Sequence, residues 1–244
     1  MQRSLKRISA ICLLFLGLLC GSPAAFAQQD FINLSFGFPS INWDYSGNLD
    51  GLRTVNASGW SITASGLKFK ENGLIYGIDV GVNRYGNGFQ YGISRPGVGE
   101  IHHFSILPLI GYNHFISGSK LSFRLNFAFG FGLVPSTNRY CKNDKSFQVK
   151  YTSYGVPLYD LTFSGTQEVK SRVFPLIKPN IELHYALGEK STLFVKGTLG
   201  VSLMNSVIVR DFPEVLLDGE TYSVTHSTSL SNSSLEIGYS YRIK

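Results

Sequence analysis

The stretch that decides the fold is Leu121-Ser-Phe-Arg-Leu-Asn-Phe-Ala-Phe-Gly-Phe-Gly-Leu133, in which two kinds of residue alternate. Every odd-numbered position is Leu or Phe, and every even-numbered position is small, polar or charged. Successive side chains of a β-strand point to opposite faces, so this period of two predicts a strand with one wholly apolar face. The fold must either cover that face with protein or expose it to lipid.

The same alternation recurs along the chain in segments of roughly ten residues. The predicted strands cover residues 31–38, 59–69, 74–83, 101–115, 121–133, 172–187, 192–204 and 235–243. The segment 172–187 contains Pro175 and Pro179. Proline cannot donate to a β-ladder, so we expect a bulge or irregular pairing there.

The connections between these strands alternate in length. Glu71-Asn72-Gly73, Ser117-Gly118-Ser119 and Gly188-Glu189-Lys190 have the composition of tight turns. The long polar connections cover residues 39–57, 84–100, 134–171 and 207–231. Within the third, we expect an alternating piece at 146–152 to extend as a hairpin. This pattern predicts an all-β fold: an eight-stranded antiparallel up-and-down transmembrane β-barrel with short periplasmic turns and long extracellular loops.

Side-chain volume predicts which face of the barrel is apolar. An eight-stranded barrel has just enough interior for side chains to fill it. Four Phe and three Leu from the strand 121–133, with similar rows from other strands, would overfill that interior. We therefore expect the apolar face to contact lipid and the narrow polar lumen to be filled by its own side chains.

The N-terminus has the features of a secretory signal peptide. Arg3, Lys6 and Arg7 precede the apolar stretch 8–20, and Ala25-Phe26-Ala27 supplies small residues for cleavage. We predict a signal peptide at 1–27, one barrel domain at 28–244 and export to the cell outer membrane.

Cleavage changes the charge and the cysteine content. The formal net charge falls from +6 to +3 when the three cations of the signal peptide are removed, so basicity does not argue for a nucleic-acid partner. Of the three cysteines only Cys141 remains, which excludes an intramolecular disulfide.

The architecture resembles the small eight-stranded outer-membrane barrels, the OmpA-like and OmpX-like group. Within that group it is most similar to the outer-membrane β-barrel proteins common in Bacteroidota. Its most specific residues are Leu235-Glu-Ile-Gly-Tyr-Ser-Tyr-Arg-Ile-Lys244, which resemble the signal read by the barrel-assembly machinery but end in Lys. The resemblance implies fold and location, with lipid, lipopolysaccharide and that machinery as partners. It implies neither a cofactor nor an activity, because this fold hosts porin-like, adhesive, enzymatic and structural members.

Charged residues on the polar faces of the strands are the first candidate site. They are Asp79, Arg124, Lys178, Glu182, Lys196 and Glu236. If the third tight turn centres on Glu189, Glu182 lies directly across from Lys196. Charges in a confined lumen should be paired, because an unpaired buried charge is costly. We expect a structural, salt-bridged plug, with a narrow porin-like path as the open alternative.

Two other functions follow from separate features. His103 and Ser105 resemble the His-x-Ser pair of outer-membrane lipid A deacylases and share a strand face, with Glu100 as a guess for the orienting acid. Aromatic residues in the loops could instead bind an extracellular ligand or adhere to host surfaces, and they could equally pack loop against loop or rest on the lipid interface. They are Trp43, Tyr45, Phe89, Tyr91, Tyr140, Phe147, Tyr151, Tyr154, Tyr159 and Phe212.

No metal site is predicted. His102, His103 and His114 lack a convincing ligand spacing, and Cys141 stands alone in a loop.

Overall fold

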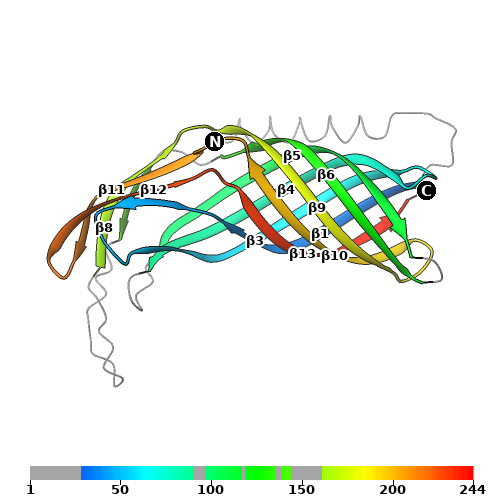
Figure 1. Cartoon of the computed structure of the whole chain (residues 1–244), viewed down its shortest axis with the longest axis horizontal. Helices are drawn as coiled ribbons and strands as arrows, with labels where there is room; N and C mark the ends of the chain where they lie inside the picture. Colours follow the sequence, from blue (N-terminus) through cyan, green and yellow to red (C-terminus); the bar gives the residue numbers. More distant parts are fainter. Residues whose placement is uncertain (1–28, 91–96, 117–118, 136–138, 144–160, 244) are drawn as a thin grey trace, which may run out of the picture.

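The computed structural model describes residues 29–90, 97–116, 119–135, 139–143 and 161–243, and it contains a closed eight-stranded barrel (Figure 1). The barrel strands are β1 (Gln29–Ile41), β3 (Arg53–Phe69), β4 (Leu74–Gln90), β5 (Gly97–Phe115), β6 (Leu121–Leu133), β9 (Val173–Ala186), β10 (Ser191–Ser202) and β13 (Asn232–Arg242). Each pairs antiparallel with the barrel strands before and after it in the chain, and β13 pairs with β1 to close the ring. The predicted fold class and all eight predicted strands are confirmed.

The barrel wall has the predicted inside and outside. Along β6 the odd-numbered side chains are exposed or partly exposed and the even-numbered ones are buried. Phe127, Phe129 and Phe131 are 49–60% exposed, while Arg124 is 3% exposed. Half-exposed phenylalanines in a continuous row suit contact with acyl chains. Exposed tyrosines lie near the periplasmic end on four of the barrel strands, β4, β5, β9 and β13, as expected at a membrane interface. They are Tyr76, Tyr112, Tyr185, Tyr239 and Tyr241.

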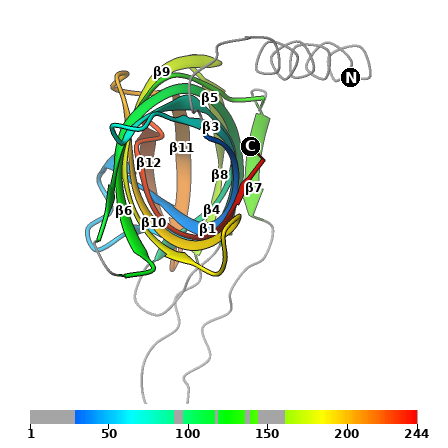
Figure 2. The same ribbon diagram turned by 90° about the vertical axis from the view of Figure 1, so that its right-hand side faces the viewer.

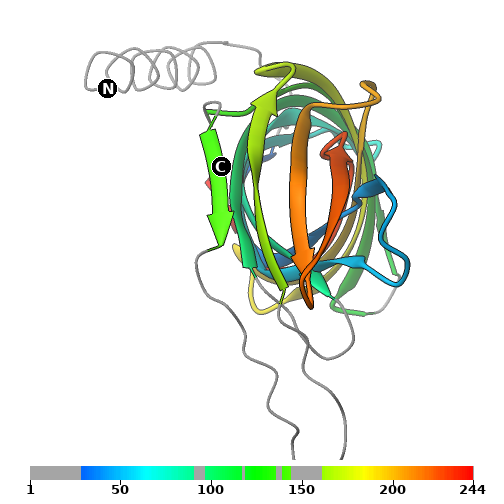
Figure 3. The same ribbon diagram turned by 90° about the vertical axis from the view of Figure 1, so that its left-hand side faces the viewer.

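A second sheet continues the wall beyond the barrel. Its strands are β2 (Asp44–Gly47), β7 (Arg139–Asn143), β8 (Leu161–Val169), β11 (Ile208–Leu217) and β12 (Glu220–Thr228), in the order β2-β12-β11-β8-β7. Viewed from the periplasmic end the barrel strands surround the axis (Figure 2), and from the opposite end β7, β8, β11 and β12 stand around the other opening (Figure 3). We call this the extracellular sheet.

The extracellular sheet has its own apolar core. Phe89 from the extended end of β4 packs against Phe163 of β8 and Phe212 of β11, with ring centroids 5.1 and 5.2 Å away. All three rings are almost completely buried. Of the alternatives for the loop aromatics, Phe89 and Phe212 therefore follow loop packing: they are buried and hold the long connections together. The predicted hairpin at 146–152 lies outside the described residues, as does the signal peptide at 1–27.

Pro175 and Pro179 produce no bulge. The register between β6 and β9 is unbroken from Leu121 paired with Tyr185 to Leu133 paired with Val173. On the other side of β9, the pairing with β10 is interrupted around Pro179 and resumes in the same register. Of the two expected outcomes, irregular pairing is therefore present as a local gap in the ladder at Pro179, and a bulge is not.

No helix among the described residues is long and apolar enough to cross a membrane.

Candidate functional site

The centre of the lumen holds two ion pairs from four different strands. Lys196 Nζ lies 2.6 Å from Glu236 Oε2, and Lys178 Nζ lies 3.5 Å from Asp79 Oδ2. All four side chains are at most 4% exposed. Lys196 on β10 and Glu236 on β13 face each other on neighbouring strands, whereas Lys178 on β9 and Asp79 on β4 pair across the interior.

Hydroxyl groups complete the coordination of the two central carboxylates. Ser35 and Ser234 donate hydrogen bonds of 2.6 and 2.8 Å to the two oxygens of Glu236. Ser65 donates a 2.7 Å hydrogen bond to Asp79. A buried carboxylate is stable when hydrogen bonds and a cation together replace the water it has lost, and both carboxylates satisfy this condition.

A second polar cluster lies closer to the periplasmic end and centres on Glu182. Arg124 Nη1 lies 3.8 Å from Glu182 Oε2, and His184 Nε2 lies 2.7 Å from the same oxygen. Asn126 Nδ2 donates to Glu182 Oε1 at 3.1 Å and to Asn180 Oδ1 at 2.8 Å. The Arg124 guanidinium also stacks 4.6 Å from the Phe69 ring centroid.

The register places Glu182 directly across from Lys196, as the position of the turn predicted. Glu236 is also across from Lys196, on its other side. The short contact of Lys196 is with Glu236, while Glu182 contacts Arg124 and His184. Every strand of a closed barrel has two neighbours, so one pair of facing residues could not reveal which carboxylate the lysine approaches.

The six candidate charges balance. Three are anionic and three are cationic, and each lies within 4.0 Å of an opposite charge inside the lumen. Breaking such a buried pair from one side is costly, whereas the intact set is neutral. Sequence reasoning missed His184, although its position two residues after Glu182 places it on the same inward face.

Aromatic rings fill the lumen where glycine makes room for them. A Cβ atom added at Gly132 would lie 2.3 Å from the Phe174 ring, and one at Gly238 would lie 2.2 Å from the Phe194 ring. Phe174 and Phe194 point inward and are buried. The inward glycines therefore widen the interior where a neighbouring strand supplies a ring.

The predicted hydrolase pair lies inside this packed interior. His103 Nε2 is 3.2 Å from Asn83 Nδ2, and His103 Nδ1 is 3.2 Å from the Tyr85 hydroxyl. Ser105 Oγ has no hydrogen-bond partner among the described residues. Glu100 is exposed and pairs with Arg84. The arrangement brings His103 and Ser105 to one face, but within the described part of the chain it supplies neither a hydrogen bond between them nor an orienting acid.

The histidines considered as metal ligands in the sequence, for which no metal site was predicted, do not converge on one point. His102 is partly exposed near Glu100, at 3.8 Å, and His114 is exposed at the periplasmic end. Cys141 lies in β7 of the extracellular sheet. Among the described residues, no group of three or more His, Cys, Asp or Glu side chains is placed to hold a metal ion.

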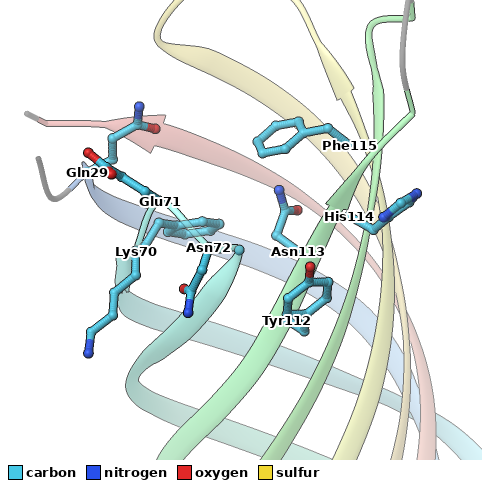
Figure 4. Close-up of a pocket in the computed structure, with 10 residues that line it drawn as sticks. Gln29, Lys70, Glu71, Asn72, Tyr112, Asn113, His114 and Phe115 are labelled. Atoms are coloured by element: carbon cyan, nitrogen blue, oxygen red, sulfur yellow. The ribbon is translucent and has the colours of Figure 1, made fainter.

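A cavity opens at the periplasmic mouth, below the charged clusters (Figure 4). Its volume is about 540 Å³, and it lies between the β3–β4 turn at Lys70–Gly73 and the end of β5 at Tyr112–Phe115. An adjoining hollow of about 170 Å³ extends inward to Arg124. We call the two together the vestibule.

The closed ring, the apolar outer surface and the polar packed interior define an integral β-barrel of the eight-stranded outer-membrane type. Neither a scan against protein-family models nor a search of curated proteins finds a match. Among solved structures, the chain is similar to the outer membrane protein OprG from Pseudomonas aeruginosa, with a TM-score of 0.53 and 10% identity, covering 88% of this chain and 96% of OprG.

Two further solved barrels are more distantly similar. Neisserial surface protein A has a TM-score of 0.42 and 12% identity, covering 91% of this chain and 100% of its own. Outer membrane protein AlkL has a TM-score of 0.39 and 18% identity, covering 92% and 94%. At these identities the similarity establishes the fold, and OprG is the comparison on which that rests.

Proposed function

We propose that this chain is exported by a signal peptide at 1–27 and spans the outer membrane as a closed barrel, with a structural role in the envelope. The observation that carries this proposal is the neutral set of three buried cations and three buried anions, which fills the lumen. The inward rings of Phe174 and Phe194 support it by occupying space beside the glycines. An OmpA-like structural role thus fits the interior better than a porin-like one.

Measuring ion conductance in planar lipid bilayers tests whether the lumen is closed to ions. The native protein should insert without stable open channels, and insertion is verified by heat-modifiable gel migration of the same preparation. A variant with Phe174→Ala and Leu176→Ala removes two fully buried inward side chains and should show openings that the native protein lacks. Stable ohmic channels in the native protein, reduced by Lys196→Ala, would establish a narrow porin-like function instead.

The proposed partners follow from the membrane location. The exposed row on β6 suits acyl chains, and lipopolysaccharide would surround the barrel at its extracellular rim. The terminal strand β13 would be read by the barrel-assembly machinery, a proposal supported by its place next to β1 at the closure of the ring. Replacing Tyr239 and Tyr241 with Ala should then slow assembly in cells, measured as the fraction of heat-modifiable protein.

A second candidate function is recognition by the extracellular sheet. The observation that favours it is the packed core of Phe89, Phe163 and Phe212, which makes the sheet a rigid platform. Binding of labelled protein to host cells or glycan arrays, compared with a variant whose β11–β12 hairpin is shortened, tests this. Equal binding by both proteins would argue against the sheet as the binding element.

A further inference from the structure

The base of the vestibule presents a hydrogen-bond donor that has no partner among the described residues. The side chain of Asn113 is 2% exposed, and its Nδ2 atom makes no hydrogen bond there. Figure 4 shows this side chain reaching from β5 into the space beside Phe115. The backbone is held in place, because Asn113 N donates to Gly73 O at 2.8 Å.

The orientation of this amide is determined by its neighbour. Arg124 Nε donates a 3.1 Å hydrogen bond to Asn113 Oδ1. A guanidinium can only donate, so the atom facing it must be the carbonyl oxygen of the amide. The NH₂ group of Asn113 is thereby left as the free end, and it requires an acceptor. The ligand that completes this position must supply an oxygen or similar acceptor atom.

The charge of the lining favours an anionic acceptor. Four basic residues line the vestibule against two acidic ones, Glu71 and Glu189. The basic residues are Lys70, Lys120, Arg124 and Arg242. Arg124 stands directly behind the amide. Although Glu182 lies 3.8 Å from Arg124 Nη1, that atom makes no hydrogen bond among the described residues, so a carboxylate accepting from Asn113 would also lie near a cation with an unused donor. Hydrogen bonds between a donor and an ionised acceptor are stronger than neutral ones.

Aromatic rings supply a wall for an apolar group. Phe69 lines both parts of the vestibule, and Phe31 packs on it with ring centroids 4.6 Å apart. Phe115 also lines both parts and is 70% exposed. A large exposed phenylalanine at a cavity mouth gains from covering by an apolar ligand body. Small-molecule sites combine such rings with a few polar groups in volumes of roughly 300 to 1,000 Å³.

We propose that the vestibule binds a small carboxylate that carries an apolar body. The carboxylate accepts from Asn113 Nδ2 in front of Arg124, and the apolar body lies against Phe69 and Phe115. The site lies at the periplasmic mouth, so it needs no open lumen and does not depend on the proposed structural role.

Calorimetric titration of the protein in lipid nanodiscs tests this, with 3-phenylpropionate as the probe and 3-phenylpropionamide as its uncharged counterpart. A parallel titration into nanodiscs without protein measures the heat of probe partitioning into lipid, which is then subtracted. We expect saturable binding of the acid and binding of the amide weaker by at least about tenfold, because the charge-assisted hydrogen bond is lost. No saturable binding of the acid, or equal binding of acid and amide, would overturn the proposal.

Three variants locate the site. Asn113→Asp keeps the acceptor for Arg124 but replaces the NH₂ donor with an oxygen, and should abolish binding of the acid. Asn48→Asp is the matched control: it makes the same change at the opposite end of the barrel, where the exposed side-chain oxygen still accepts from Ser223 N. It should change the affinity by less than about threefold, since exposed charges are screened. Phe115→Ala should weaken 3-phenylpropionate and leave the protein folded, as the ring is mostly exposed.

Heat-modifiable migration checks that each variant is folded. If Asn113→Asp does not fold, the comparison of acid with amide binding and the Phe115→Ala variant still test whether the vestibule binds the carboxylate. Unchanged affinity in both Phe115→Ala and a folded Asn113→Asp variant would show that any binding occurs elsewhere.

Discussion

Replacing Lys196 with Met should destabilise the barrel, because the carboxylate of Glu236 would remain buried without its closest cation. In the native protein Lys196 Nζ lies 2.6 Å from Glu236 Oε2, and both side chains are buried. Methionine matches the length of the lysine stem, so the change removes the charge with little loss of volume. Glu236 then keeps its hydrogen bonds from Ser35 and Ser234 but loses its closest cation.

The expected cost is about 3 to 5 kcal/mol, the usual effect of leaving one partner of a buried pair uncompensated. This is a large share of the roughly 5 to 15 kcal/mol by which folded proteins are typically stable. Urea unfolding in lipid vesicles, followed by tryptophan fluorescence, measures it. Lys190→Met, in an exposed turn, is the matched control and should stay within about 0.5 kcal/mol of the native protein.

A double-mutant cycle separates the pair from other effects. Adding Glu236→Gln to Lys196→Met removes the stranded charge, so the double variant should be more stable than the sum of the two single losses predicts. A loss below about 1 kcal/mol in Lys196→Met would refute the reasoning, because the lysine would then contribute no more than a surface pair. Strictly additive losses would refute the pairing itself.

Three other changes test the packing, the pH response and the lipid face. Gly132→Ala should destabilise the barrel by about 1 to 3 kcal/mol in urea unfolding, because its Cβ would lie 2.3 Å from the buried Phe174 ring, whereas Gly188→Ala, with open space around it, should not. Burial lowers the pKa of His226 in the extracellular sheet to about 3. Since the unfolded sheet takes up a proton near pH 6.5 and the folded one does not, the sheet should lose about 1.4 kcal/mol per pH unit as pH falls from 6.5 towards 3, and hydrogen exchange in β12 should report this. Phe127→Arg, on the exposed row of β6, should cost about 2 to 4 kcal/mol in lipid vesicles, and a neutral result would place that row away from the bilayer.

The barrel could be predicted from the sequence because its strands are defined by alternation, which is a local signal. The row from Leu121 to Leu133 and its counterparts identified all eight strands, and side-chain volume identified the outer face. The extracellular sheet was missed because its strands lie in polar connections with weaker alternation. One signal was present: Asp218-Gly219 has positive φ at both residues, 52° and 90°, and forms the β11–β12 turn. An Asp-Gly pair between two strand-like segments is a strong hairpin signal.

The sequence predicted which residues face the lumen at the candidate site, but not which of them contact each other. Alternation assigns Glu182, Lys196 and Glu236 to the inward face, and turn position aligns neighbouring strands. The choice between Glu182 and Glu236, which flank Lys196 on the two neighbouring strands, depends on side-chain conformations that no local pattern encodes. The vestibule was not predictable either, because it forms where Asn113 on β5 meets Arg124 on β6 beside a turn of β3 and β4.

The buried charges also specify the register of the barrel. Apolar side chains that face lipid discriminate little between alternative strand registers, because lipid surrounds them in each one. A slip by one residue, however, would turn every side chain of a strand to the opposite face. For β9, such a slip would move Lys178 and Glu182 into lipid and break their contacts with Asp79 and Arg124. An ionised side chain at the middle of the bilayer costs roughly 2 to 4 kcal/mol when it is Arg or Lys, and less when it is Asp or Glu. The penalty for a slipped strand therefore exceeds any gain from local pairing. The buried charges therefore favour the native strand register over registers shifted by one residue. An apolar interior of equal volume could pack as well but would not make this distinction.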